Sequence, residues 1–144
     1  MSEDLAVGSS LVALTVLIHT AGLIGLAWLT PPLARGLGFH AHRLGQAMVM
    51  TGSVLAIFAL HTSEVWLWAF AYAAIKATAS FPDALDLSTA MFSTIGYGDI
   101  HVPPSWRLLT ALEGINGFIL IGWSTAYLVA VSTRHGPFRK GDHF

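Results

Sequence analysis

Three long apolar stretches set what this chain can fold into. They cover residues 5–29, 45–77 and 105–131. A helix needs about 20 mainly apolar residues to cross the hydrocarbon core of a bilayer, and each stretch reaches that length. Only 10% of the 144 residues are charged, and the mean hydropathy is +0.64. This is too apolar for a soluble domain of this size. The sequence therefore predicts an all-α integral membrane protein with three transmembrane helices.

A short glycine-containing stretch lies between the second and third apolar regions. Residues 94–100 read TIGYGDI. Glycine adopts positive φ without a steric penalty, so Gly96 and Gly98 allow successive carbonyl groups to turn toward one side. A stack of carbonyls can replace the hydration shell of a monovalent cation. The side chains of Ile95 and Tyr97 are then expected to point away from the carbonyls, into protein.

This stretch resembles the selectivity filter of the tetrameric pore-loop potassium channels, TxGYGD in its common form. By this resemblance, Gly98 belongs to the filter, the Thr94 hydroxyl closes the innermost ion site, and Asp99 lies at the outer mouth. The potassium ions are expected at the carbonyls of four consecutive residues: Thr94, Ile95, Gly96 and Tyr97. One chain supplies one such loop, and four are needed to close a ring, so a four-fold homotetramer is expected.

The residues before the glycine stretch predict a short helix. Ser80, Pro82 and Asp83 are helix-start signals, and residues 80–93 allow only about three turns. We interpret this segment as a re-entrant pore helix that leads into an extended filter. Non-helical backbone at membrane depth is tolerated only when it is buried in protein or lines water.

The resemblance also implies roles for residues near the filter stretch. Met91 stands where the family usually has a second Thr, and with Ser93 and Glu113 it is expected to support the filter. The Met leaves two alternatives, a potassium-selective channel or a weakly selective monovalent cation channel. Gly117 lies near the family's inner-helix hinge glycine, and it either permits bending or allows close helix contact.

The resemblance divides the chain into three parts. Residues 1–44 form an additional N-terminal transmembrane helix and a cytoplasmic loop, residues 45–131 form the two-helix pore domain, and residues 132–144 form a short cytoplasmic tail. Five of the seven Lys and Arg residues fall in the first loop and the tail. The positive-inside rule therefore predicts a cytoplasmic C-terminus and an external N-terminus. The resemblance implies that the membrane is an inner (plasma) membrane.

Several polar residues fall inside the predicted spans. His61 and Glu64 are three residues apart on one helical face, so they can approach each other. Glu113 or Glu64 is expected either to bind the pore helix and make conduction sensitive to pH, or to form a structural pair. His19 and His61 leave open a different class, a haem-binding electron-transfer protein. An intramembrane hydrolase is disfavoured because no nucleophile or metal-ligand spacing is present.

The remaining expectations concern partners. The net charge is -1, and no basic face suggests nucleic acid. We expect lipid and further copies of this chain as partners, no soluble substrate, no enzymatic activity, and no cofactor other than permeating K⁺. A voltage-sensing helix is not expected, because the spans carry no ladder of Arg or Lys.

Overall fold

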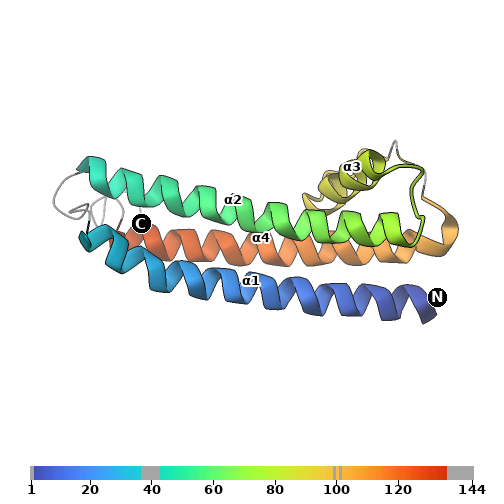
Figure 1. Cartoon of the computed structure of the whole chain (residues 1–144), viewed down its shortest axis with the longest axis horizontal. Coiled ribbons are helices and arrows are strands. Elements are labelled where there is room, and N and C mark those ends of the chain that lie inside the picture. Colours follow the sequence, from blue (N-terminus) through green and yellow to red (C-terminus); the bar gives the residue numbers. More distant parts are fainter. Residues whose placement is uncertain (1, 37–42, 99, 101, 136–144) are drawn as a thin grey trace. The chain divides into compact units, whose positions relative to one another are not determined.

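The structure is a computed structural model, and it describes residues 2–36, 43–98, 100 and 102–135. Its elements are α1 (Ser2–Gly36), α2 (Arg43–Ala74), α3 (Phe81–Phe92), the 3-10 helix η2 (Pro104–Trp106) and α4 (Arg107–His135) (Figure 1). No β-strand occurs among the described residues. The prediction of an all-helical chain is confirmed.

Three of these helices are long and apolar enough to cross a membrane. The candidate spans are Asp4–Pro32, Arg43–Ala74 and Pro104–Arg134. They correspond to the three apolar stretches of the sequence, so the predicted number of spans is confirmed. The protein is a multi-pass membrane protein.

The first helix extends beyond its expected end. Pro31 and Pro32 lie inside α1, which continues to Gly36 and changes direction near the two prolines (Figure 1). Proline removes a backbone donor and its ring crowds the preceding turn, which bends a helix. Membrane helices nevertheless tolerate proline, because neighbouring groups satisfy the freed carbonyls. The two prolines therefore bend α1 and do not terminate it.

The second helix ends three residues before its expected boundary at Ala77. Lys76 adopts a left-handed conformation with φ of 55°. Its N–H donates to the Ala73 carbonyl at 3.2 Å, and the Ala77 N–H donates to the Tyr72 carbonyl at 2.9 Å. These two bonds form a Schellman motif, which satisfies carbonyls at a helix end. Glycine usually occupies the left-handed position, so a lysine there gave no termination signal.

The short helix α3 begins and ends close to the predicted positions. The Ser80 side chain caps its first turn by accepting a hydrogen bond from the Asp83 N–H at 3.2 Å. Ser93 is the C-cap. A helix of 12 residues is about 18 Å long, which is less than the hydrocarbon thickness of about 30 Å. The helix α3 is therefore too short to cross a membrane.

The chain divides into two compact units. The first comprises Met1–His19 and His61–Ile121, and the second comprises Thr20–Leu60 and Gly122–Phe144. In the first unit, α3 lies beside the C-terminal part of α2 (Figure 1), and the Ser88 hydroxyl donates to the Val65 carbonyl at 2.9 Å. The core of this unit is built from large buried residues on α2, α3 and α4: Trp68, Tyr72, Leu87, Phe92, Leu109 and Leu120. The glycine stretch belongs to this unit.

Candidate functional site

The chain turns sharply where α3 ends. The Thr94 N–H donates to the Met91 carbonyl at 2.9 Å. The N–H groups of Ile95 and Gly96 both donate to the Ala90 carbonyl at 3.0 Å. The last carbonyls of the helix are thereby satisfied, and the backbone leaves α3 in an irregular conformation over residues 95–98. We call residues 94–98 the glycine loop.

The backbone dihedral angle φ is positive at every second residue of the glycine loop. Thr94, Gly96 and Gly98 have φ values of 62°, 56° and 74°. The positive φ predicted for the two glycines is confirmed, and the positive φ of Thr94 was not predicted. In a chain with φ of one sign, successive carbonyls point to opposite sides. Inverting alternate residues is the backbone condition for turning them toward one side, and glycine meets it without the cost that a Cβ imposes.

The side chains of the glycine loop are not buried by this chain. Ile95 is 58% exposed and Tyr97 is 74% exposed. The expectation that both side chains point into protein is therefore not met within the single chain. The described residues leave more than half of each side chain uncovered. Asp99, the expected outer-mouth residue, lies outside the described residues.

The three expected supporting residues differ in how they meet the glycine loop. The Met91 side chain reaches the loop, since its Cε lies 3.8 Å from the position that a Cβ on Gly96 would take. The Ser93 hydroxyl donates to the Thr89 carbonyl of its own helix at 2.7 Å and does not reach the loop. Met91 and Gly98 also line a small cavity of about 50 Å³.

Glu113 lies at the centre of a buried polar cluster. Its side chain is fully buried on α4. The Tyr72 hydroxyl on α2 donates to Oε2 at 2.5 Å, and the Ser88 hydroxyl oxygen on α3 is hydrogen-bonded to Oε1 at 2.5 Å. A buried carboxylate is costly unless hydrogen bonds compensate it, and both oxygens here have a partner. Glu113 therefore connects three helices of the first unit, and its contact with α3 is the one expected from its depth.

Gly117 lies against the end of α3. A Cβ at this position would stand 2.2 Å from the Phe92 carbonyl oxygen. Only a residue without a side chain permits this approach of α4 to the last turn of α3. Of the two readings left open for Gly117, close helix contact is the one that this geometry supports directly. Gly114, one turn earlier, would place its Cβ at an ordinary distance of 3.5 Å from the Met91 carbonyl oxygen.

A second buried polar cluster joins α1 to α2. The Nδ1 atoms of His19 and His61 lie 3.0 Å from Oε1 and Oε2 of Glu64, respectively. The two rings are stacked with centroids 5.4 Å apart. A haem between two histidines needs rings that point at the iron from opposite faces, and stacked rings at this distance leave no room for a porphyrin. Glu64 therefore hydrogen-bonds the two histidines, whereas one of the two expectations placed it against the short helix α3.

The helix α1 also contacts α4. The Asn116 amide nitrogen donates to the Thr15 hydroxyl at 2.9 Å, and both residues are buried. Interhelical hydrogen bonds of this kind hold membrane helices together. This contact with α4 joins a residue pair that lies 101 positions apart in the sequence.

A family model described as an ion channel matches residues 47–134, which is more than half of the chain. The chain belongs to this ion-channel family. The match includes most of α2, all of α3, the glycine loop and nearly all of α4, whereas α1 precedes it. No curated protein and no solved structure matches the chain.

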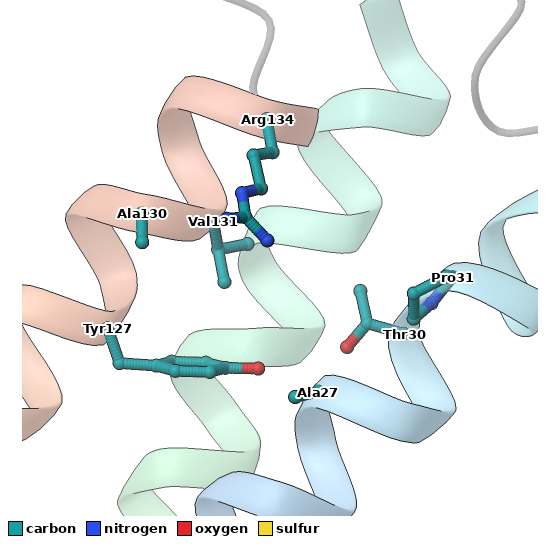
Figure 2. Close-up of a pocket in the computed structure, with 7 residues that line it drawn as sticks. All are labelled: Ala27, Thr30, Pro31, Tyr127, Ala130, Val131 and Arg134. Carbon is teal, nitrogen blue, oxygen red and sulfur yellow. The ribbon is translucent and has the colours of Figure 1, made fainter.

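The channel has a separate cavity in its second unit. It measures about 100 Å³ and lies between the C-terminal parts of α1 and α4. Figure 2 shows the Tyr127 side chain extending from α4 toward Thr30, and the Arg134 side chain lining the same cavity. No residue of the glycine loop lines this cavity.

Sequence reasoning missed the partners of the buried polar groups in this channel. Tyr72 and Ser88 gave no signal for Glu113, because a tyrosine and a serine in apolar helices are common. Only the residue type of Glu113 itself, an ionisable group within a span, indicated that partners must exist. The i, i+3 spacing of His61 and Glu64 did predict their contact, and the distance confirms it.

Proposed function

We propose that this channel conducts potassium ions passively through rings of backbone carbonyls in the glycine loop. The carbonyls of Thr94, Ile95, Gly96 and Tyr97 form the ion sites in this proposal, and the Thr94 hydroxyl contributes to the innermost one. The observation that carries it is the alternating positive φ at residues 94, 96 and 98. This backbone accompanies a sequence that resembles a potassium filter, within a chain of an ion-channel family.

The exposed glycine loop supports a ring of four copies. Its backbone is non-helical, and Ile95 and Tyr97 are exposed in the single chain. Each unpaired backbone group that faces lipid costs roughly several kcal/mol. The loop must therefore face water on one side and protein on the other. Four chains around one axis provide both, with carbonyls toward the ion path and side chains against neighbouring copies.

Conduction then follows from electrostatics and needs no bond to break. An ion leaves its water shell for rings of carbonyl oxygens, and repulsion between ions in adjacent sites moves them along. The C-terminal end of α3 meets the loop at Ser93. A helix C-terminus carries about half a negative elementary charge, which favours a cation near it.

The orientation of the channel is part of the proposal. Arg35 lies at the end of α1, Arg43 begins α2, and Arg134 lies at the end of α4, whereas Arg107 begins α4 at its other end. Basic residues gather on the cytoplasmic side of membrane proteins. We infer that the ends with Arg35, Arg43 and Arg134 lie in the cytoplasm and that the N-terminus lies outside, in an inner (plasma) membrane.

Alanine at the two loop glycines tests the filter. A left-handed conformation costs roughly 1–2 kcal/mol for a residue with a Cβ, so Gly96→Ala and Gly98→Ala should turn carbonyls out of the ring. We expect both variants to abolish potassium flux in liposomes while they assemble as the unsubstituted channel does. Gly52→Ala is the matched control, because a Cβ there meets nothing within 4 Å. Undiminished flux in both loop variants would contradict the filter assignment.

A further inference from the structure

The cluster of His19, His61 and Glu64 offers three ligand atoms at one point. One nitrogen from each histidine and a carboxylate oxygen all lie within 4.8 Å of one another. The His19 Nδ1 atom lies 3.0 Å from Oε1 of Glu64, and the His61 Nδ1 atom lies 3.0 Å from Oε2. His19 and Glu64 are fully buried, and the His61 side chain is 18% exposed. The three residues come from two helices, α1 and α2, within the first unit.

The distances are close to those of a tetrahedral metal site. Zinc binds imidazole nitrogen at about 2.0–2.1 Å and carboxylate oxygen at about 2.0–2.2 Å. Ligand atoms at those bond lengths are separated by about 3.3 Å in a tetrahedron. Each nitrogen to oxygen separation of 3.0 Å is within a few tenths of an ångström of that value, but each histidine faces a different oxygen. The three ligand atoms, which lie within 4.8 Å of one another, must therefore draw together around the ion. Two histidines and one carboxylate form a set that zinc sites use, with a fourth position left for water.

We propose that His19, His61 and Glu64 bind a divalent transition-metal ion such as Zn²⁺. Imidazole ligands favour Zn²⁺ and its first-row neighbours over Ca²⁺ or Mg²⁺, which take oxygen ligands. The Glu64 carboxylate offsets part of the ion's charge in a buried site. The ion enters from the side of His61, the one ligand with an exposed surface, and water occupies the fourth position there.

The bound ion fixes the additional helix to the channel domain. His19 belongs to α1, which precedes the ion-channel family match, while His61 and Glu64 belong to α2 within it. The His61 ring also contacts the Phe92 ring edge-on, with centroids 5.5 Å apart. Phe92 is the last residue of α3, immediately before the turn into the glycine loop. Metal binding therefore acts on the packing around the end of α3. This inference goes beyond the proposed potassium conduction and does not depend on it.

The test measures metal binding in a protein that keeps only these two histidines. Asparagine replaces the other five histidines of the sequence: His40, His42, His101, His135 and His143. The protein is purified in detergent through a tag without histidine. Equilibrium dialysis against micromolar Zn²⁺ followed by elemental analysis gives the stoichiometry, and Co²⁺ in place of Zn²⁺ gives a visible spectrum that reports tetrahedral coordination.

We expect one ion per chain and a tetrahedral Co²⁺ spectrum in this background. His61→Asn and Glu64→Gln should each abolish both signals, and Thr15→Val should leave both intact, because it removes an α1 to α4 hydrogen bond outside the cluster. Failure of the background protein to bind Zn²⁺ overturns the proposal. So does retention of the bound ion by either ligand variant. The Co²⁺ spectrum of the protein that keeps only His19 and His61 is measured on folded protein. This result therefore remains valid even if a ligand variant fails to fold.

Discussion

Glu113 shows how a single buried side chain can organise a membrane protein. Its two oxygens are hydrogen-bonded to the hydroxyls of Tyr72 on α2 and Ser88 on α3. Ser88 also lies 2.9 Å from the Val65 carbonyl, although a serine hydroxyl has only one proton to donate. Because the Val65 carbonyl can only accept, the contact between Ser88 and Glu113 must receive its proton from the group at position 113. An amide or a protonated carboxyl at that position supplies it.

The need for a proton donor at position 113 predicts that Glu113→Gln is tolerated and Glu113→Ala is not. The glutamine amide nitrogen can donate to the Ser88 oxygen while its carbonyl accepts from Tyr72. Alanine leaves the buried Tyr72 hydroxyl without its acceptor, which costs about 1–3 kcal/mol, and it adds the cost of a cavity, whereas Ser88 keeps the Val65 carbonyl as its acceptor. We expect Glu113→Ala to lower the free energy of unfolding by roughly 2–5 kcal/mol and Glu113→Gln by less than half of that. Unfolding in detergent followed by circular dichroism measures both, and equal losses would contradict the proton count.

At the scale of elements, the position of the glycine loop depends on how α3 is held at each of its ends. Ser80 caps the first turn, and the last turn lies against Gly117 of α4. The loop begins directly after that last turn. A shift of α3 along or away from α4 would therefore move the whole loop. Both ends can be tested by single substitutions with matched controls.

Alanine at Gly117 should separate α3 from α4. Its Cβ would stand 2.2 Å from the Phe92 carbonyl oxygen, which is backbone and cannot rotate away. Overpacking of this kind typically costs about 1–3 kcal/mol. We expect Gly117→Ala to lower thermal stability and to reduce flux. Gly114→Ala, at 3.5 Å from the Met91 carbonyl oxygen, should be neutral or stabilising, because alanine has the higher helix propensity. Equal behaviour of the two variants would show that the contact does not fix α3.

Removal of the Ser80 cap should weaken α3 at its other end. Ser80→Ala deprives the Asp83 N–H of its 3.2 Å acceptor, and loss of such a cap costs about 1 kcal/mol. Ser80→Asp keeps a side-chain oxygen in place and should retain the stability of the unsubstituted channel. Thermal unfolding of the three proteins under one detergent condition measures the difference. A loss in the Asp variant as large as that in Ala would contradict a capping role.

Local signals in the sequence predicted α3 and the glycine loop well, whereas contacts between residues far apart in the sequence could not be predicted. The start of α3 follows from Ser80 and Pro82, and the positive φ of Gly96 follows from its residue type. The positive φ of Thr94 does not, because it results from the turn that the Ala90 and Met91 carbonyls impose. The partner of Glu64 on α1, His19, lies 45 positions away, and no periodicity links two separate apolar helices.

At the scale of the molecule, the single chain leaves its loop and much apolar surface uncovered. Leu17 on α1, Phe58 on α2 and Phe118 on α4 are each at least 66% exposed. Lipid can cover such side chains, because a bilayer is as apolar as they are. Lipid cannot cover the non-helical backbone of the glycine loop. We therefore propose that the loop, and not the apolar surface, requires further copies of the chain.

This requirement predicts a tetramer in the membrane. Cross-linking of the channel in liposomes should give a ladder that ends at four subunits, and native mass spectrometry in detergent should give the same number. Gly52→Ala should not change the ladder, because its Cβ meets nothing within 4 Å. A ladder that ends at two subunits would contradict a ring of four glycine loops.

The most direct test of potassium conduction compares two ions in the same liposomes. Purified channel is reconstituted, and flux is recorded under a potassium gradient and under an equal sodium gradient, at acidic and at neutral pH. The account predicts flux with potassium and little with sodium, because the carbonyl rings replace the hydration shell of the larger ion more fully. Equal flux of the two ions would contradict a selective filter and would point to Met91, the residue beside Gly96, as the cause of weak selectivity.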